Sequence, residues 1–372
     1  MQAQQHSITA PHAPAAYVLH SFHYGTPGSG KKVYIQAALH ADEVPGMLVA
    51  QFLRTRLHEL EAAGKLRGEV ILVPAANPLG LAQAIQGAPF GRFDLTTGIN
   101  FNRAYKHVAD DLKQSLAGLL GADAQHNVSI IRSHARDAVA AWRPDTDAGA
   151  LKKILLGLAI DADIVLDLHC DNEAVLHLYA GTPLAEDART LSSLLGAQAV
   201  LLALAAGGEP FDEACSRLWW DLHEHFGDDY PIPAACFAST VELRGEVEVD
   251  YDLARQDADA LIRFMAHHGV IDAEVGEIAA PLCEATPLEG VEPVLAPHAG
   301  VLVYARKLGE RLQPGDAVAD IVNPVSGDIT TLRCTTGGVF FARSAHRHVL
   351  RGMNVGKIAG ADAYRSGSLL SQ

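Results

Sequence analysis

Short apolar runs alternate with longer amphipathic stretches up to about residue 275. Apolar runs of roughly four to eight residues are typical of buried strands, and the stretches between them fit helices. Predicted strands cover 33–39, 69–73, 163–169, 174–180, 198–204 and 235–243, and predicted helices cover 45–60, 129–142, 147–159, 184–195 and 250–268. Because the strands are almost continuously apolar, the pattern predicts an α/β fold with a mostly parallel sheet covered on both faces.

The pattern changes at two places along the chain. A segment rich in Gly, Pro and Asn, 74–105, follows the second predicted strand, and loops of this length are usually functional or disordered. From about residue 276, short β-type segments punctuated by Pro and Gly replace the helical periodicity. This predicts an α/β domain at 1–275 and a small all-β domain, a barrel or sandwich, at 276–372.

Composition and charge narrow the class of protein. The 372 residues are 49% hydrophobic and 20% charged, as in a globular protein of two domains. The net charge of -15 argues against a nucleic-acid partner, which needs clustered Lys and Arg. The five cysteines form no CxxC pair, the start lacks a signal-peptide pattern, and no apolar run approaches the roughly 20 residues of a membrane span. We therefore expect a cytoplasmic protein without a membrane partner, and the sequence leaves assembly into a homo-oligomer open.

Metal-ligand residues follow two of the predicted strands. His40 and Glu43 lie in LHADE, and His169 ends the strand DIVLDLH, 126 residues after Glu43. The carboxyl ends of parallel strands meet at one edge of a sheet, and two histidines with one glutamate are a catalytic zinc pattern that leaves a position open. His58 and Glu61 have the same spacing as the first pair, but they lie on a charged helix with the features of a solvated face.

Two groups of residues could complete a hydrolase site. Arg92, Asn102 and Arg103 lie in the long loop, where an arginine can hold a substrate carboxylate or stabilise an oxyanion. Glu242 stands on an apolar strand, where a carboxylate beside an activated water can act as general base. The alternative is that Arg92 and Arg103 are ordinary surface loop residues and that Glu242 is an exposed glutamate at the end of a strand.

The choice of general base and the orientation of the histidines depend on neighbouring carboxylates. Glu246 and Glu248 closely follow Glu242, so chemistry alone does not single out the base. Asp167 lies two residues before His169 and therefore on the same face of the strand, where it can fix the tautomer of an imidazole.

Four short motifs resemble the succinylglutamate desuccinylase/aspartoacylase family, the deacylase branch of the zinc carboxypeptidase-like proteins. They are LHADE, NFNR, DLH and VEL before a glycine, which occur in the family's order between about residues 33 and 245, and the β-rich tail is similar to that of many bacterial members. The resemblance implies one Zn²⁺ per chain bound by His40, Glu43 and His169, with Arg92 polarising the scissile carbonyl, Asn102 and Arg103 binding the substrate carboxylate, and Glu242 as general base.

The resemblance also implies a fold and a reaction. The expected fold is a phosphorylase/hydrolase-like three-layer α/β/α sandwich with a mixed, mostly parallel sheet, followed by a domain resembling a barrel-sandwich hybrid. The expected activity is hydrolysis of the amide bond of an N-acyl amino acid or a related small compound. The chain departs from the family at Ala41 and Asp42, where Gly-Asn is common, and at Arg244, where many members have glycine. Arg244 would lie near the base and alter the substrate pocket.

Other functions share parts of this pattern. A zinc carboxypeptidase acting on peptides would use the same metal and arginine residues, and a narrow pocket would distinguish a deacylase from it. The tail at 297–324 has the spacing of short strands and turns that is typical of biotinyl- and lipoyl-carrier domains. The expected hairpin tip at 322–328, however, has no lysine to carry the prosthetic group. A metal-free binding protein or pseudoenzyme also stays open from the sequence.

Overall fold

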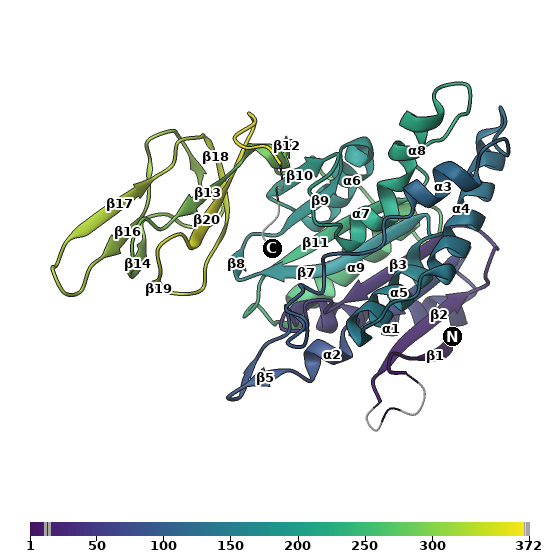
Figure 1. The fold of residues 1–372 in the computed structure, drawn as a ribbon, viewed down its shortest axis with the longest axis horizontal. Coiled ribbons are helices and arrows are strands. Elements are labelled where there is room, and N and C mark those ends of the chain that lie inside the picture. The colour runs from purple at the N-terminus through teal and green to yellow at the C-terminus, as the bar shows by residue number, and fades with distance from the viewer. Residues whose placement is uncertain (11–12, 14–15, 368, 370–372) are drawn as a thin grey trace.

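A nine-stranded mixed sheet forms the centre of the larger domain in this computed structural model, which describes residues 1–372 except 11–12, 14–15, 368 and 370–372 (Figure 1). In spatial order its strands are β1 (Gln2–Ser7), β2 (Val18–Gly25), β4 (Glu69–Val73), β3 (Lys32–Ala37), β7 (Ile164–Asp171), β11 (Phe237–Gly245), β9 (His177–Gly181), β10 (Ala199–Ala203) and β12 (Ala285–Pro287). The β1/β2, β2/β4 and β11/β9 pairs are antiparallel, and the other pairs between described neighbours are parallel.

Helices cover both faces of this sheet (Figure 1). One layer contains α1 (Pro45–Ala62), α6 (Ala185–Leu195) and α9 (Tyr251–His267), and the other contains α3 (Ala109–Ser115), α4 (Ala124–Ala141), α5 (Asp147–Ala159), α7 (Phe211–Ser216) and α8 (Leu218–Phe226). Successive strand residues face opposite layers, so Leu166 and Leu168 join one core while Val165 joins the other. The predicted three-layer α/β/α arrangement is confirmed.

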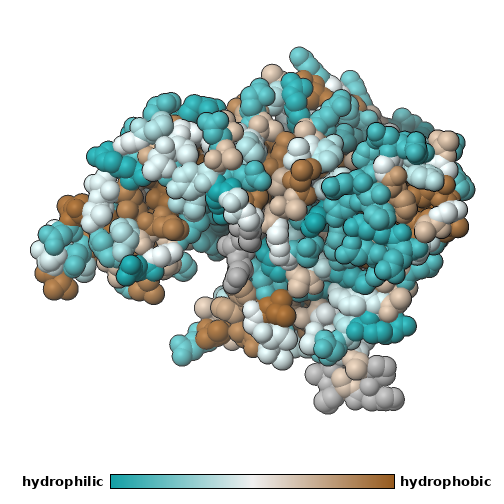
Figure 2. Space-filling model, turned by 45° about the horizontal axis from the view of Figure 1, so that its top comes forward, coloured by the Kyte–Doolittle hydropathy of each residue, from teal (hydrophilic) through white to brown (hydrophobic). Residues whose placement is uncertain are grey.

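The C-terminal β domain is built from two antiparallel sheets around one core. The first sheet contains β13 (Val291–Leu295), β20 (Asn354–Gly360), β18 (Gly338–Arg343) and β15 (Arg311–Leu312), and the second contains β17 (Ile329–Arg333), β16 (Ala317–Val322), β14 (Gly300–Tyr304) and β19 (His348–Val349). Buried side chains from both sheets, such as Leu302 and Phe340, share the core, which confirms the predicted all-β region. Figure 2 shows hydrophobic surface at its outer end, and exposed Val325 and Ile329 belong to this domain.

The two domains are joined by strand pairing as well as by the chain. The short strand β8 (Glu173–Ala174), which follows β7 in the chain, pairs with β18. Glu173 also forms ion pairs with Arg343 and Arg347, each with a shortest N–O distance of 2.6 Å. The predicted domain boundary at 275/276 remains a prediction, and β12 beyond it pairs with β10 in the large sheet.

Some elements were not predicted from the hydrophobic pattern. β1, with the sequence QAQQHS, is a largely exposed edge strand, so pairing with β2 and not burial accounts for it. The long loop contains a short helix, α2 (Pro78–Leu81), and a two-stranded hairpin, β5 (Ala84–Ile85) with β6 (Ala88–Pro89). The strand predicted at 174–180 is divided into β8 and β9. Within the described residues, none of the helices combines the length and the hydrophobicity that a membrane crossing requires.

Candidate functional site

Three neighbouring parallel strands bring the candidate residues to one edge of the sheet. His40 follows β3, while His169 and Glu242 lie near the carboxyl ends of β7 and β11, where they are directly paired. Between β3 and His40, the buried Ala38 has a φ of 58°, a left-handed conformation that is costly for a residue with a Cβ. This sharp turn ends the strand and directs the chain toward α1.

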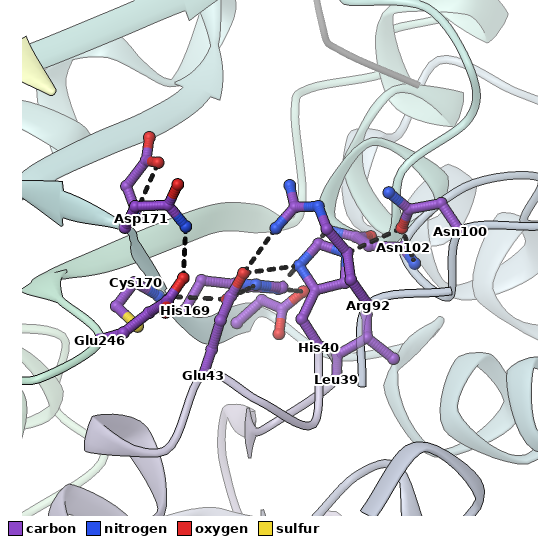
Figure 3. A network of polar contacts seen from close by, with 12 residues as sticks. Leu39, His40, Glu43, Arg92, Asn100, Asn102, His169, Cys170, Asp171 and Glu246 are labelled. Atoms are coloured by element: carbon purple, nitrogen blue, oxygen red, sulfur yellow. Dashed lines mark hydrogen bonds and ion pairs between the residues drawn. The ribbon is translucent and has the colours of Figure 1, made fainter. Parts of the chain in front are cut away.

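His40, Glu43 and His169 converge on one point (Figure 3). Nδ1 of His40 lies 2.9 Å from Oε1 of Glu43, and Nδ1 of His169 lies 2.7 Å from Oε2 of the same carboxylate. The three potential ligand atoms lie within 4.8 Å of one another. All three side chains are buried, with exposures of 2–3% for the residues.

The outer nitrogens of both imidazoles face oxygen acceptors. Nε2 of His40 lies 2.7 Å from Oδ1 of Asn100, and Nε2 of His169 lies 3.0 Å from Oδ2 of Asp167. The contact with Asn100 favours the proton of His40 on Nε2, which leaves the Nδ1 lone pair of His40 facing the Glu43 carboxylate. Three electron-rich groups then meet in a buried space, which is favourable only if positive charge lies between them. The donor set therefore fits a divalent cation, for which imidazole and carboxylate are good ligands.

Burial and the charges of neighbouring residues shift the pKa values of all three residues in this cluster. Burial lowers the pKa of His169, but the carboxylates of Asp167 and Glu43 raise it more, so it ends well above its usual value. Burial raises the pKa of Glu43, but the two histidines lower it more, so it ends well below its usual value. For His40, burial and nearby Arg92 lower the pKa. The cluster thus favours a cationic charge between its carboxylate and its imidazoles.

Arg92 reaches the cluster because its loop packs tightly on the turn after β3. A Cβ on Gly91 would lie 2.4 Å from the Asp42 nitrogen, so only glycine allows this approach. The Ala41 N–H donates to the Gly91 carbonyl at 3.0 Å, which fixes the contact. Arg92 Nη1 then donates to Oε1 of Glu43 at 2.8 Å (Figure 3).

Asn102 and Arg103 lie between α7 and the candidate metal-ligand cluster, which is formed by His40, Glu43 and His169. The side-chain oxygen of Asn102 accepts from the Phe211 N–H at 2.9 Å, and its Nδ2 lies 3.5 Å from Nε2 of His169. Arg103 Nη1 donates to the Asn102 carbonyl at 2.7 Å. The next residue, Ala104, has a φ of 56°, so the backbone turns sharply here.

Lys152 of α5 binds the backbone of this loop. The side chain is buried, and its Nζ donates to the carbonyls of Arg103 and Asn100 at 2.6 and 3.3 Å. Burial lowers the pKa of Lys152 to about 8. One ammonium group therefore ties together two residues of the loop, one of which accepts from His40.

Glu242 faces the same cavity as the metal-ligand cluster. Its Oε2 is buried and has no hydrogen-bond partner among the described residues. Burial and the neighbouring charges of Glu43 and Asp171 raise the pKa of Glu242 to about 8. A nearby cation would lower this pKa again, which suits a group that must accept a proton.

Arg244 does not lie with the other predicted site residues. Its two terminal nitrogens donate to both carboxylate oxygens of Asp257 in α9, each at 2.8 Å. The side chain is therefore fixed against α9, and among the described residues it does not line the cavity that contains Glu242. The other seven predicted residues all line that cavity: His40, Glu43, Arg92, Asn102, Arg103, His169 and Glu242.

Several residues around the cavity were not predicted from the sequence. Lys357 of β20 brings the C-terminal domain into its wall and forms an ion pair with Asp171 at 2.5 Å. Asn100, Asp212 and Glu213 were also missed, because isolated polar residues in loops carry no distinctive spacing. Lys152 could have been found, because it interrupts the buried face of α5 formed by Leu151, Leu155 and Leu156.

Comparison with known proteins shows which family this chain resembles. A sequence model of the succinylglutamate desuccinylase/aspartoacylase catalytic domain matches residues 29–131, which include His40, Glu43, Arg92, Asn102 and Arg103. A solved succinylglutamate desuccinylase/aspartoacylase family protein from Shewanella amazonensis is 28% identical, with a TM-score of 0.83 over 96% of this chain and 98% of that chain. The chain is similar to the succinylglutamate desuccinylase/aspartoacylase family in this part of its sequence and in its fold. Members of this family include deacylases, so the predicted resemblance is confirmed.

Other solved members of the succinylglutamate desuccinylase/aspartoacylase family share the fold over nearly the whole chain. One from Shewanella frigidimarina is 26% identical, with a TM-score of 0.84 over 96% of this chain and 97% of that chain. One from Rhodobacter sphaeroides is 18% identical, with a TM-score of 0.64 over 96% and 95% of the two chains. No curated protein matches the sequence significantly.

Proposed function

We propose that this chain is a zinc-dependent amidohydrolase that removes the acyl group from an N-acyl amino acid or a related small N-acyl compound. One observation carries the proposal: two buried imidazoles direct their Nδ1 atoms at opposite oxygens of one buried carboxylate, at 2.9 and 2.7 Å. The similarity to a family that includes deacylases supports the choice of amide hydrolysis. His40, Glu43 and His169 would hold one Zn²⁺ per chain.

The chain's own residues would divide the work around the scissile amide. A bound zinc ion supplies a Lewis acid that polarises the carbonyl and activates water. Glu242 would accept the proton of the attacking water and then pass it to the departing amine. Arg92, whose Nη1 lies beside Glu43, would donate to the developing oxyanion. Asn102 and Arg103 would bind the substrate carboxylate, for which a guanidinium has matching geometry.

The shape of the cavity favours a small substrate over a peptide. Lys357 of the C-terminal sheet and Leu288, which follows β12, both line the cavity beside the metal-ligand cluster. Residues from the C-terminal part of the chain therefore form part of the cavity wall, which leaves less room for an extended peptide. This supports a deacylase over the carboxypeptidase alternative.

A direct test combines metal analysis with a substrate screen. We expect the purified protein to bind about one equivalent of zinc and to hydrolyse at least one compound from a panel of N-acetyl, N-succinyl and N-formyl amino acids. Removing the metal with a chelator should abolish hydrolysis, and adding zinc should restore it. Full activity in the metal-free protein, or no zinc binding at all, would refute the proposal.

A further inference from the structure

The chain between β10 and α7 forms a loop, residues 204–209, at the wall of the cavity. Ala206 of this loop lines the cavity. The residues Gly207, Gly208 and Glu209 all have positive φ values, of 88°, 80° and 52°. A backbone in this conformation continues neither a helix nor a strand, so the loop depends on contacts with neighbouring elements to keep one position.

The 204–209 loop is paired with the part of the chain that contains Arg103. The N–H of Ala104 donates to the Gly208 carbonyl at 2.8 Å. The next N–H, that of Tyr105, donates to the Glu209 carbonyl at 3.0 Å. Arg103 and these two donor residues together form the arginine segment. A Cβ on Gly208 would lie 2.8 Å from Cδ of Arg103, so the arginine side chain also packs on the loop backbone.

Glu213 connects the 204–209 loop to α7. Its Oε1 accepts from the Ala206 N–H, near the middle of the loop, at 2.5 Å. Burial raises the pKa of Glu213 to about 8, so the carboxyl is protonated at neutral pH. A protonated carboxyl still accepts through its carbonyl oxygen, so this contact does not need a charge. Trp220 fixes the start of the loop, because its Nε1 donates to the Leu204 carbonyl at 3.1 Å.

We propose that Glu213 is a positioning residue, which fixes the 204–209 loop through Ala206 so that the loop holds Arg103 in place for the substrate carboxylate. This inference rests on the proposed deacylase function, in which Arg103 binds that carboxylate. Glu213 itself acts on the substrate only through the loop. A loop that shifts would move both the backbone and the side chain of Arg103, and small displacements of a positioning group are costly.

Two substitutions separate the hydrogen bond of Glu213 from its charge. E213Q keeps a carbonyl oxygen for the Ala206 N–H, whereas E213M fills a similar space without this acceptor. Both remove the carboxylate whose charge acts on Arg103. A defect that appears in E213M and is restored in E213Q therefore reports the hydrogen bond. Equal defects in both variants would mean that the charge acts directly on Arg103, and would overturn the inference.

Hydrogen exchange follows the loop and the arginine segment without requiring a reaction. In the zinc-loaded full chain, E213M should speed amide exchange roughly tenfold at Ala206 and also at Ala104 and Tyr105, as expected for one lost hydrogen bond. E213Q should keep wild-type rates. E224M, which removes an exposed carboxylate from α8, is the matched control and should also keep them. Faster exchange at Ala206 alone would overturn the inference.

The wild-type protein provides a second measurement if E213M does not fold. The amides of Ala206, Ala104 and Tyr105 should have similar protection, because the loop and the arginine segment open together. Protection at Ala104 and Tyr105 that exceeds the protection at Ala206 by tenfold or more would show that the two segments open separately. That result would overturn the inference.

Kinetics tests the consequence for the substrate. With the panel compound that the wild type hydrolyses fastest, E213M should raise KM about 10- to 100-fold and change kcat little, because the carboxylate contact serves ground state and transition state alike. E213Q should restore the wild-type KM. An unchanged KM in E213M would overturn the inference and leave the reaction standing. If the wild type hydrolyses none of the panel, the proposed reaction fails, and hydrogen exchange alone decides whether Glu213 positions Arg103.

Discussion

Replacing Lys152 with methionine separates loop positioning from overall stability. In the wild-type chain, Nζ of Lys152 holds the carbonyls of Arg103 and Asn100, and Asn100 in turn accepts from the metal-ligand candidate His40. Methionine has a similar length and fills the same space, but it cannot donate to either carbonyl. The loop then keeps its packing and loses the two contacts that fix its backbone.

The expected loss of stability is small because two terms oppose each other. Two hydrogen bonds from a charged donor contribute roughly 3–6 kcal/mol together. The fall of the Lys152 pKa from 10.5 to about 8 corresponds to a burial penalty of roughly 3 kcal/mol on the charged form. Their difference leaves K152M destabilised by about 0–3 kcal/mol. K152M should also weaken zinc binding, because residues that orient a metal ligand change metal affinity by about 10–100-fold.

The assay is a zinc competition titration at a temperature where both proteins are fully folded. We expect zinc affinity to fall about tenfold in K152M, with a parallel fall in kcat/KM for the best N-acyl substrate. K153M is the matched control, because Lys153 also donates to two carbonyls, those of Trp142 and Ala140, at 2.6 and 2.9 Å. Wild-type zinc affinity in K152M, or an equal loss in K153M, would refute the positioning role.

Four further changes test other parts of the site and fold. E43Q should weaken zinc binding by more than roughly 100-fold, as measured by elemental analysis and titration, because a ligand matters more than a residue that only orients one. E242Q should keep its zinc and lower kcat by about 10²–10⁴-fold, the usual contribution of a general base; a wild-type kcat would exclude that role. R244M should lower the free energy of unfolding by about 3 kcal/mol, since it leaves the buried Asp257 unpaired, and its KM then tests the substrate role that the sequence predicted. Because burial raises the Glu213 pKa from 4.5 to about 8, the folded state binds this proton more tightly than the unfolded state, and stability is lost as the pH rises through this window. The melting temperature of E213Q relative to wild type should therefore increase between pH 5 and pH 9, and a constant difference would contradict this.

The central strands and the residues at their ends could be predicted because burial determines both. Strands β3, β7 and β11 are buried on both faces, so their apolar runs are continuous in the sequence. A polar residue at the end of such a run then stands out, as His169 and Glu242 do. Edge strands such as β1 depend on pairing with a neighbour and have no comparable signal.

Contacts between distant segments account for what the sequence did not reveal. Arg244 was expected near the substrate because of its position beside Glu242, but Asp257 of α9, 13 residues further on, determines where its guanidinium lies. Lys357 enters the cavity only because β20 belongs to a sheet that is joined to the larger domain through β8. Neither interaction follows from local periodicity, since both depend on how separate elements pack.

Because β20 contributes to the cavity wall, the candidate metal ligands and part of the wall around them belong to different domains. The three candidate metal ligands come from the turn after β3 and from β7, while Lys357 belongs to a domain with its own hydrophobic core. Substitutions in that core can tilt or loosen the wall without touching a metal ligand. The shape of the cavity can therefore change through the C-terminal sequence while the three candidate metal ligands stay in place.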